Sequence, residues 1–476
     1  MATINESAIK TPGVYINEIP LFPPAVAQVA TAIPAFIGYT QVAKNKVDDD
    51  LLFVPKRITS MVEYETYFGK AVDETIAVDI SGDIDADPAS AVVAPITAPA
   101  LVYRMYYSMR MYFANGGGAC YVVSVGKFTD TIDDGDEDEG LLGGLEALEK
   151  EDEPTIIVFP DGPGLPDMNT YYGVIDQALD QCNRLADRVT LIDIYQTAAQ
   201  DDADNIDDFR STVRSEKDYV MYGMTYHPWI ETTLSFSYTG TTATIGTHSG
   251  HGATDLSGAT LDSIQATNNG LYNKIKTEID KLHVFLPPSS SLAGIYVRVD
   301  ATRGVWKAPA NVSVLGVVKP EVNYNDKDQE DLNVDVMAGK SINAIRSFVG
   351  RGTLVWGART LAGNDNEWRY VSVRRFFNMV EESTKKASAQ FVFEPNDANT
   401  WVKVRAMIEN YLTVLWRQGA LAGAKPEHAF FVKVGLGQTM TADDILNGKM
   451  IVEIGLAVVR PAEFIILRFM HKMQES

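Results

Sequence analysis

The sequence predicts an α/β fold, because β-strand and helix patterns alternate along its middle part. β-Branched runs at residues 155–159 and 189–194 read as buried strands, and an amphipathic helix at 169–185 separates them. The last part of the chain, in contrast, is rich in strand patterns, which gives the whole an α+β character. A length of 476 residues predicts two to three domains, or one large core that carries insertions.

The chain opens with a proline-flanked extended segment at residues 11–20. Proline lacks the N–H that a helix interior or a central strand needs, so this segment is predicted to be an arm that adds to the edge of another sheet. Residues 29–39 follow as a buried strand, interrupted by Pro34.

The middle of the chain is predicted from periodicity and from helix start and stop signals. We expect helices at residues 61–68, 101–114, 141–149, 169–185, 202–215 and 271–283, and strands at 121–125, 155–159, 189–194 and 219–226. Residues 71–98 are acidic and read as a loop or an inserted element. The Thr/Ser/Gly-rich stretch at 231–262 is predicted to form a hairpin, with its alternating part at 233–245.

Residues 286–476 form a different block, which opens with a helix at 293–301. Its clearest element is a helix at 396–419, where one apolar stripe is expected to face the core. This stripe consists of Trp401, Val404, Ile408, Tyr411 and Leu415. Strands are predicted at 452–458 and 463–470, and the second of these, an apolar strand, needs a partner for its edge.

Charge is distributed very unevenly along the sequence. The net charge is −22, and three acidic runs at 73–87, 130–153 and 201–208 account for all of it. This excess of acidic residues argues against a general nucleic-acid binder, because phosphate binding needs clustered Lys and Arg. The two cysteines exclude a disulfide scaffold, and we expect no secretion signal and no membrane span.

A search for catalytic and ligand-binding motifs predicts no cofactor and no metal. Gly116-Gly-Gly118 lacks the Lys and Ser/Thr of a phosphate loop, and Gly435-x-Gly437 has Met440 where a dinucleotide fingerprint needs glycine. Asp134, Asp136 and Asp138 have calcium-loop spacing without its glycine and glutamate. His248 and His251 have no further ligand at a suitable spacing, and Cys120 reads as a core residue.

Several separated motifs, in the right order, resemble the contractile tail sheath protein family of myophage tails, R-type pyocins and extracellular contractile injection systems. The longest is residues 287–318, which includes Arg303-Gly-Val-Trp-Lys307 and Asn311. Others are Thr11-Pro-Gly-Val-Tyr-Ile-Asn-Glu-Ile, Gly357-Ala-Arg359, Tyr370-Val-Ser-Val-Arg-Arg375 and Arg460-Pro-Ala-Glu-Phe464. The resemblance covers residues 8–40 and 286–472 well, and 41–285 only in pieces.

The resemblance implies a structural subunit and not an enzyme. Such subunits stack as six-membered rings around an inner tube, link to their neighbours by exchanged β-strands, and contract to drive the tube through a cell envelope. It implies an inner domain from residues 1–40 and 286–476, an inserted outer domain from 41–285, and as partners further copies of the chain, the tube protein, and baseplate and terminator proteins. Nucleic-acid contact and membrane insertion are not expected. Assembly is expected in the bacterial cytoplasm, before possible release of the particle.

Two sets of residues are candidates for contacts between subunits. The predicted linking residues are Val14, Tyr15, Ile16 and Ile19 in the arm, and Phe464, Ile465, Ile466 and Leu467 near the end. The predicted packing or contact residues are Arg303, Trp306, Lys307 and Asn311. Two alternatives stay open: an acidic α/β enzyme with its site in residues 155–230, using Asp161 and Asp193 at strand ends, and a capsid or baseplate structural protein.

Overall fold

A computed structural model describes residues 26–86, 91–197 and 200–468 of the chain. The chain divides into two compact units. The small unit comprises Met379–Val459 together with Met1–Val29, and the large unit comprises Ala30–Asn378 together with Arg460–Ser476. The predicted boundaries at 40/41 and 285/286 both fall inside the large unit. The assignment of inner and outer domains concerns the assembled particle and stays a prediction.

The large unit is built on a nine-stranded sheet with the order β12-β15-β14-β8-β7-β6-β1-β5-β2. The six strands from β14 to β5 run parallel, and β2, β15 and β12 are antiparallel to their neighbours. In sheet order the strands are β12 (Val312–Ser313), β15 (Gly352–Val355), β14 (Asn343–Phe348), β8 (Gly223–His227), β7 (Val189–Ile192), β6 (Ile156–Val158), β1 (Pro34–Thr40), β5 (Cys120–Lys127) and β2 (Lys56–Ile58). The predicted α/β class is therefore confirmed.

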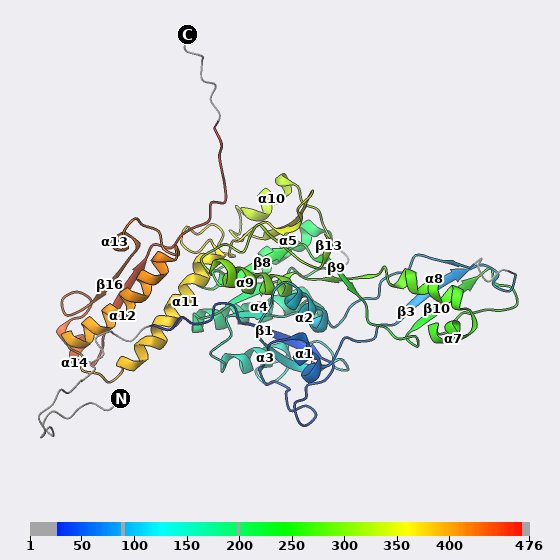
Figure 1. The fold of residues 1–476 in the computed structure, drawn as a ribbon, viewed down its shortest axis with the longest axis horizontal. Coiled ribbons are helices and arrows are strands. Elements are labelled where there is room, and N and C mark those ends of the chain that lie inside the picture. The colour runs from blue at the N-terminus through cyan, green and yellow to red at the C-terminus, as the bar shows by residue number, and fades with distance from the viewer. Residues whose placement is uncertain (1–25, 87–90, 198–199, 469–476) are drawn as a thin grey trace, which may run out of the picture. The chain divides into compact units, whose positions relative to one another are not determined.

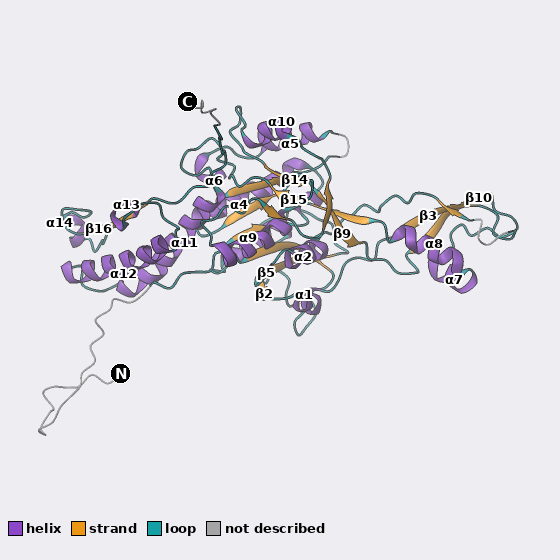
Figure 2. Cartoon of the chain, turned by 45° about the horizontal axis from the view of Figure 1, so that its top comes forward, coloured by secondary structure: helices purple, strands orange, loops and turns teal. Residues whose placement is uncertain are grey.

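Helices cover both faces of this sheet, as Figure 2 shows. One face carries α3 (Gly140–Glu149) and α4 (Met168–Leu185), and the other carries α2 (Met105–Ala114) and α9 (Ser289–Arg303). Successive residues of β1 reach the two layers, because side chains alternate along a strand. The Phe36 ring meets the Tyr112 ring of α2 with centroids 5.0 Å apart, and Ile37 lies against Gly144 of α3.

The large unit also contains α1 (Met61–Phe68), α5 (Asp202–Thr212), α6 (Lys217–Val220), α10 (Asp326–Asn333) and the start of α11 (Val371–Ser388). Helix α1 begins where its sequence predicts, because the Ser60 side chain accepts a hydrogen bond from the N–H of Glu63. Residues 217–220 form α6 and not the start of the predicted 219–226 strand, which begins only at Gly223.

The predicted hairpin at 231–262 is wrong. The structure forms β9 (Ile230–Ser235), which pairs with β11 (His283–Leu286) and β13 (Val317–Pro320), and β10 (Ala243–Ser249), which pairs with β3 (Ile76–Ser81). The alternating pattern shows that these residues form strands, but it carries no information on which strand each one pairs with. β10 and β3, with β4 (Val92–Val93), α7 (Leu261–Thr267) and α8 (Asn269–Ile279), enclose a separate small core.

The small unit combines helices with a two-stranded sheet. Its elements are the end of α11, α12 (Ala398–Arg417), α13 (Pro426–Ala429), β16 (Phe430–Val434), α14 (Ala442–Leu446) and β17 (Val452–Leu456) (Figure 1). Short 3₁₀ turns lie at Gly162–Gly164 in the large unit and at Ala389–Phe391 in the small unit. The predicted core stripe on α12 is confirmed for Val404, Ile408, Tyr411 and Leu415, which are buried where the helix packs on β16, whereas Trp401 is only half-buried. In the described residues, no helix is long and apolar enough to span a bilayer.

Candidate functional site

In the part of the chain that the structure describes, the sheet of the small unit has two strands. β16 and β17 pair antiparallel over five residue pairs, from Phe430 opposite Leu456 to Val434 opposite Val452. No third strand joins them among the residues that the structure describes. A strand that has a neighbour on one side only presents unpaired N–H and C=O groups along its other edge, and such edges accept further strands.

One face of this two-stranded sheet is covered by α12, and the opposite face carries Phe431. The Phe431 side chain is 48% exposed. Its ring lies against Gly455 of β17, where an added Cβ would stand 2.2 Å from a ring atom. Phe431 thus shields the backbone at the one position of β17 that has no side chain. Sequence reasoning missed β16 altogether, although Val432 and Val434 alternate with exposed residues there.

The end of the described chain exposes four large apolar side chains in a row. Phe464, Ile465, Ile466 and Leu467 are 71%, 78%, 79% and 72% exposed. Residues 463–468 carry no strand, so the strand predicted at 463–470 is wrong for this described part. A strand requires hydrogen bonds to a neighbouring strand, and residues 463–468 have no such neighbour within the described chain. The sequence pattern indicates only that these residues favour the strand conformation.

The four candidate residues of the N-terminal arm, Val14, Tyr15, Ile16 and Ile19, lie outside the described residues. The described chain begins at residue 26. Three residues later, the N–H of Val29 donates a hydrogen bond of 3.1 Å to Oγ of Ser383 on α11, within the small unit.

The candidate packing or contact residues lie at the last residue of α9 and on the loop that follows it. Trp306 is half-buried, and its ring meets Phe376 of α11 edge-on with centroids 6.5 Å apart. This contact requires Gly304, because an added Cβ there would come within 2.5 Å of the indole. Arg303 and Lys307 are exposed. Asn311 adopts φ +56°, its N–H donates to the carbonyl of Val355, and its side chain accepts from Arg351.

Asp161 and Asp193, the residues of the alternative enzyme hypothesis, lie where α/β enzymes bind ligands, beyond the carboxyl ends of β6 and β7. Both are fully buried. Asp161 accepts hydrogen bonds from the backbone N–H groups of Tyr39 (2.7 Å) and Arg104 (2.5 Å). Asp193 accepts from the N–H of Ser289 (3.0 Å) and from its hydroxyl (2.5 Å).

These bonds place the two carboxylates at the starts of α2 and α9, where they satisfy N–H groups that have no partner within the helix. Burial raises the pKa of Asp161 to about 6 and that of Asp193 to about 7, although the hydrogen bonds and Arg104 act in the opposite direction. The side chains therefore hold two helix starts against the sheet. Perturbed pKa values often mark functional sites, but here burial of the two carboxylates explains the raised values, and capping of the helices explains why the carboxylates are there.

The other candidate ligands do not assemble into a metal site. Among the described residues, no group of three or more His, Cys, Asp and Glu side chains could hold an ion. Nε2 of His248 lies 2.9 Å from the carbonyl oxygen of Gly82, and its Nδ1 accepts from the N–H of Leu256, so both ring nitrogens are used within the fold. Cys120 and Cys182 are buried, and burial raises the pKa of both thiols.

Comparisons with known proteins agree on one class of protein. The family model described as the phage tail sheath C-terminal domain matches residues 363–471. In a cryo-EM structure of an extracellular contractile injection system, the PVC sheath complex in its contracted state, one chain is 31% identical over 98% of both chains, with a TM-score of 0.63. In the six-fold symmetrised baseplate of the anti-feeding prophage, a chain is 32% identical over 98% of this chain and 100% of that one, also with a TM-score of 0.63.

A curated relative agrees over a shorter stretch. The tail sheath protein of Burkholderia phage BcepMu is 32% identical over 144 residues, which is 29% of this chain and 30% of that protein. The match therefore spans less than a third of the relative's length, whereas the two solved structures match almost from end to end.

Proposed function

The chain belongs to the contractile tail sheath protein family, and from this membership we propose that it polymerises as stacked six-membered rings around an inner tube and contracts to drive that tube through a target cell envelope. It is a structural subunit of a phage tail or tail-like particle. The observation that carries the proposal is the end-to-end likeness, at 31% identity, to a subunit of a contracted sheath complex.

Exchanged strands would link the subunits. The donors are the arm around residues 14–19 and the tail residues Phe464, Ile465, Ile466 and Leu467. The acceptor is the β16–β17 sheet of a neighbouring copy, which offers two open edges for two donors. Main-chain hydrogen bonds supply affinity in such pairings, and the alternate side chains supply specificity. Burying the four apolar tail side chains adds about 1.5–3 kcal/mol for each one that becomes fully covered.

The remaining partners follow from the same class of particle. A related chain occurs in the solved baseplate of the anti-feeding prophage, which supports contact between this sheath and a baseplate. We infer that the tube protein and a terminator protein complete the particle, that assembly takes place in the bacterial cytoplasm, and that the energy of contraction is stored in the extended lattice.

Deleting residues 1–20 tests the linkage. We expect a folded subunit with an unchanged melting temperature that forms no sheaths, because one of the two donor strands is gone. Negative-stain microscopy of the purified full chain should show long striated tubes, and the deleted chain should show none. Normal tubes from the deleted chain would contradict the linkage, and a monomer with catalytic turnover would contradict the sheath assignment itself.

Substitution Ile465→Asp tests the second donor. A charge at the centre of the exposed apolar run opposes its burial in a neighbour, so we expect at least a tenfold loss of polymer in a sedimentation assay. Val47→Asp is the matched control, since Val47 is also an exposed aliphatic residue at 68% but lies in the loop before β2. Equal polymer yields from the two variants would count against the tail as a donor.

A further inference from the structure

The chain returns from the small unit to the large unit at Val459/Arg460, and one carboxylate anchors it directly after this crossing. Glu463 Oε1 accepts hydrogen bonds from Arg359 Nε (2.9 Å) and Asn333 Nδ2 (3.0 Å), and Oε2 accepts from Arg359 Nη2 (2.6 Å) and the Tyr370 hydroxyl (3.3 Å). We call these four residues the C-terminal clamp. The next residue, Phe464, begins the exposed apolar tail.

Arg359 is itself fixed to the central sheet. Its N–H donates to Asn343 Oδ1 (2.7 Å), and Asn343 Nδ2 donates to the carbonyl of Arg359 (2.8 Å). Asn343 is buried in β14, and it also donates to the carbonyl of Thr225 in β8. An unbroken series of hydrogen bonds therefore runs from two strands of the sheet, through Asn343 and Arg359, to Glu463 at the start of the tail.

A second buried pair anchors the chain where the N-terminal segment enters the large unit, at Val29/Ala30. Asp300 on α9 accepts from Arg375 Nη1 (3.1 Å), Arg375 Nη2 (2.6 Å) and the Thr31 hydroxyl (2.6 Å), and Arg375 Nη2 also donates to the carbonyl of Thr31 (2.9 Å). The guanidinium stacks on the Tyr296 ring at 4.5 Å. We call Thr31, Asp300 and Arg375 the N-terminal clamp.

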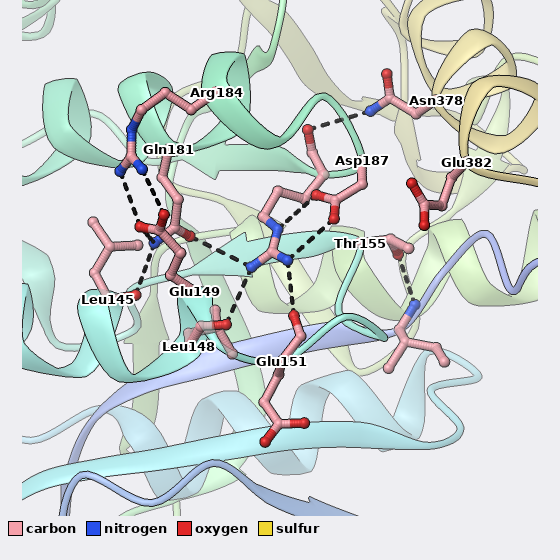
Figure 3. A network of polar contacts seen from close by, with 12 residues as sticks. Leu145, Leu148, Glu149, Glu151, Thr155, Gln181, Arg184, Asp187, Asn378 and Glu382 are labelled. Carbon is pink, nitrogen blue, oxygen red and sulfur yellow. Dashed lines mark hydrogen bonds and ion pairs between the residues drawn. The ribbon is translucent and has the colours of Figure 1, made fainter. Parts of the chain in front are cut away.

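The third crossing lies inside α11, between Asn378 and Met379. Asn378 Nδ2 donates to the carbonyl of Arg188 (3.2 Å), and Asn378 Oδ1 accepts from Arg374 Nε (2.7 Å). Arg188 is buried and belongs to the polar network of Figure 3, in which its guanidinium binds Asp187 and the carbonyls of Leu148 and Glu151. All three crossings are thus held, on the large-unit side, by buried polar side chains.

We propose that the C-terminal and N-terminal clamps are the anchors that carry tension from the linking arms into the central sheet. The proposal rests on the proposed function, because only exchanged strands would place the arms under tension. A pull on the tail meets four hydrogen bonds to a carboxylate, two of them in a bidentate pair with a buried guanidinium. Releasing Glu463 would leave the charge of Arg359 buried and unpaired, which makes this step costly.

The two clamps also explain motif residues that the sequence analysis could not assign. Arg359, Arg375 and Glu463 each fall in a segment that resembles the family, yet none of them is placed to contact a ligand. In the structure these three residues and Asp300 form two Arg–carboxylate pairs, one at the base of each arm. Their role is to position the arms, and the exchanged strands themselves would make the contact with the neighbour.

Mobility at the base of the tail tests the C-terminal clamp in the unassembled full chain. A nitroxide on Ala462→Cys reports this mobility, and labelling is selective because Cys120 and Cys182 are buried. We expect an immobilised spectrum in the parent chain and a mobile one after Glu463→Gln, with a smaller change after Tyr370→Phe, which removes only the 3.3 Å bond. A label on Leu467→Cys, beyond the clamp, should be mobile in all of them. Unchanged immobilisation after Glu463→Gln would overturn the proposal.

Resistance of assembled sheaths to shear tests the mechanical part. At a temperature where every subunit is folded, sheaths of Glu463→Gln and of Asp300→Asn should break into fragments at least threefold shorter than those of the parent chain. Glu409→Gln is the matched control, because it disrupts the exposed Arg405–Glu409 pair on α12. Fragments of parental length from both clamp variants would overturn the proposal. Absence of sheaths from the parent chain would reject the proposed function instead, and the label would still report on the clamp.

Discussion

At the scale of single residues, Asp193 shows how a position typical of catalysis can serve the fold. It follows β7 directly and is completely covered, and its two oxygens bind the N–H and the hydroxyl of Ser289 at the start of α9. Asp161 does the same for α2, and it needs Gly38 beside it, because an added Cβ there would come within 2.4 Å of its carboxylate. The place where related architectures hold a ligand is filled by the chain's own side chains.

Burial of Asp193 predicts a pH dependence of stability. Its pKa rises from an ordinary value near 4 to about 7, so folding favours the protonated form. The free energy of unfolding should therefore fall as pH rises from about 4 to 7, by up to about 4 kcal/mol from this group, and then level off. Denaturation of the parent chain and of Asp193→Asn across this range measures the effect, since the variant lacks this slope.

Asp167→Asn supplies the control with the opposite sign. Hydrogen bonds from the start of α4 lower the pKa of Asp167, and the bond from the Thr170 N–H has the largest effect. Its contribution to stability is present above the unfolded pKa and is lost as pH falls through the folded one. Parallel slopes for Asp193→Asn and the parent chain would show that Asp193 titrates normally in the fold.

At the scale of elements, helices α2 and α9 approach each other closely through one glycine. An added Cβ at Gly294 would stand 2.4 Å from the carbonyl oxygen of Tyr112 and 3.0 Å from Cβ of Asn115. Asn115 also accepts from the N–H of Leu315 and donates to its carbonyl, so it ties the end of α2 to a distant loop. The packing of this helix pair therefore depends on the absence of a side chain at position 294.

Substitution Gly294→Ala should destabilise the subunit by about 1–3 kcal/mol, because the two helices must move apart to admit the methyl group. Gly173→Ala on α4 should instead stabilise it by up to about 1 kcal/mol, since no atom lies within 4 Å of the added Cβ and alanine is the better helix former. Chemical denaturation of both variants and of the parent chain measures the two changes in the free energy of unfolding. A destabilisation of the same size at both positions would contradict the packing argument.

Local elements could be predicted from the sequence where their cause is local. The helix at 61–68 was predictable because its Ser60 cap and its glycine stop lie within the element, and α4 has its Asp167 cap and clear periodicity. The partners of β9 and β10, and the position of β16, depend on segments far away in the chain, which no local pattern encodes.

The candidate site divides in the same way. The apolar run from Phe464 to Leu467 could be read from the sequence, because its four residues are consecutive. The structure adds that all four side chains are exposed, as expected of a surface that binds a partner. The clamp at its base was not predictable, since Arg359 and Glu463 are separated by 104 residues and meet only through the tertiary fold.

At the scale of the whole molecule, the acidic charge can act on the assembly as well as on solubility. The run within residues 130–153 includes the loop between β5 and α3, and the run at 201–208 belongs to the first turns of α5. Each copy carries −22, so a lattice of many copies accumulates like charge, and we infer that repulsion forms part of its balance.

Replacing the acidic side chains between Asp133 and Glu139 by amides tests this balance. We expect sheaths to form at a lower salt concentration than the parent chain requires, because added salt otherwise screens the repulsion over about 8–10 Å. Light scattering across a salt series, followed by the rate of contraction, measures the shift. An identical salt dependence of assembly for both chains would show that repulsion between these acidic side chains does not affect the stability of the sheath.

The insertion of Met379–Val459 between two segments of the large unit has a consequence for the order of folding. The pair Arg359–Glu463 closes a loop that contains the entire insertion, and the entropy lost on closing a loop grows with the length of free chain inside it. A folded insertion acts as a short link, whereas an unfolded one is a long free chain. The Arg359–Glu463 pair would therefore form only late in folding. Partly folded chains would lack an anchored tail and would bind neighbouring subunits poorly.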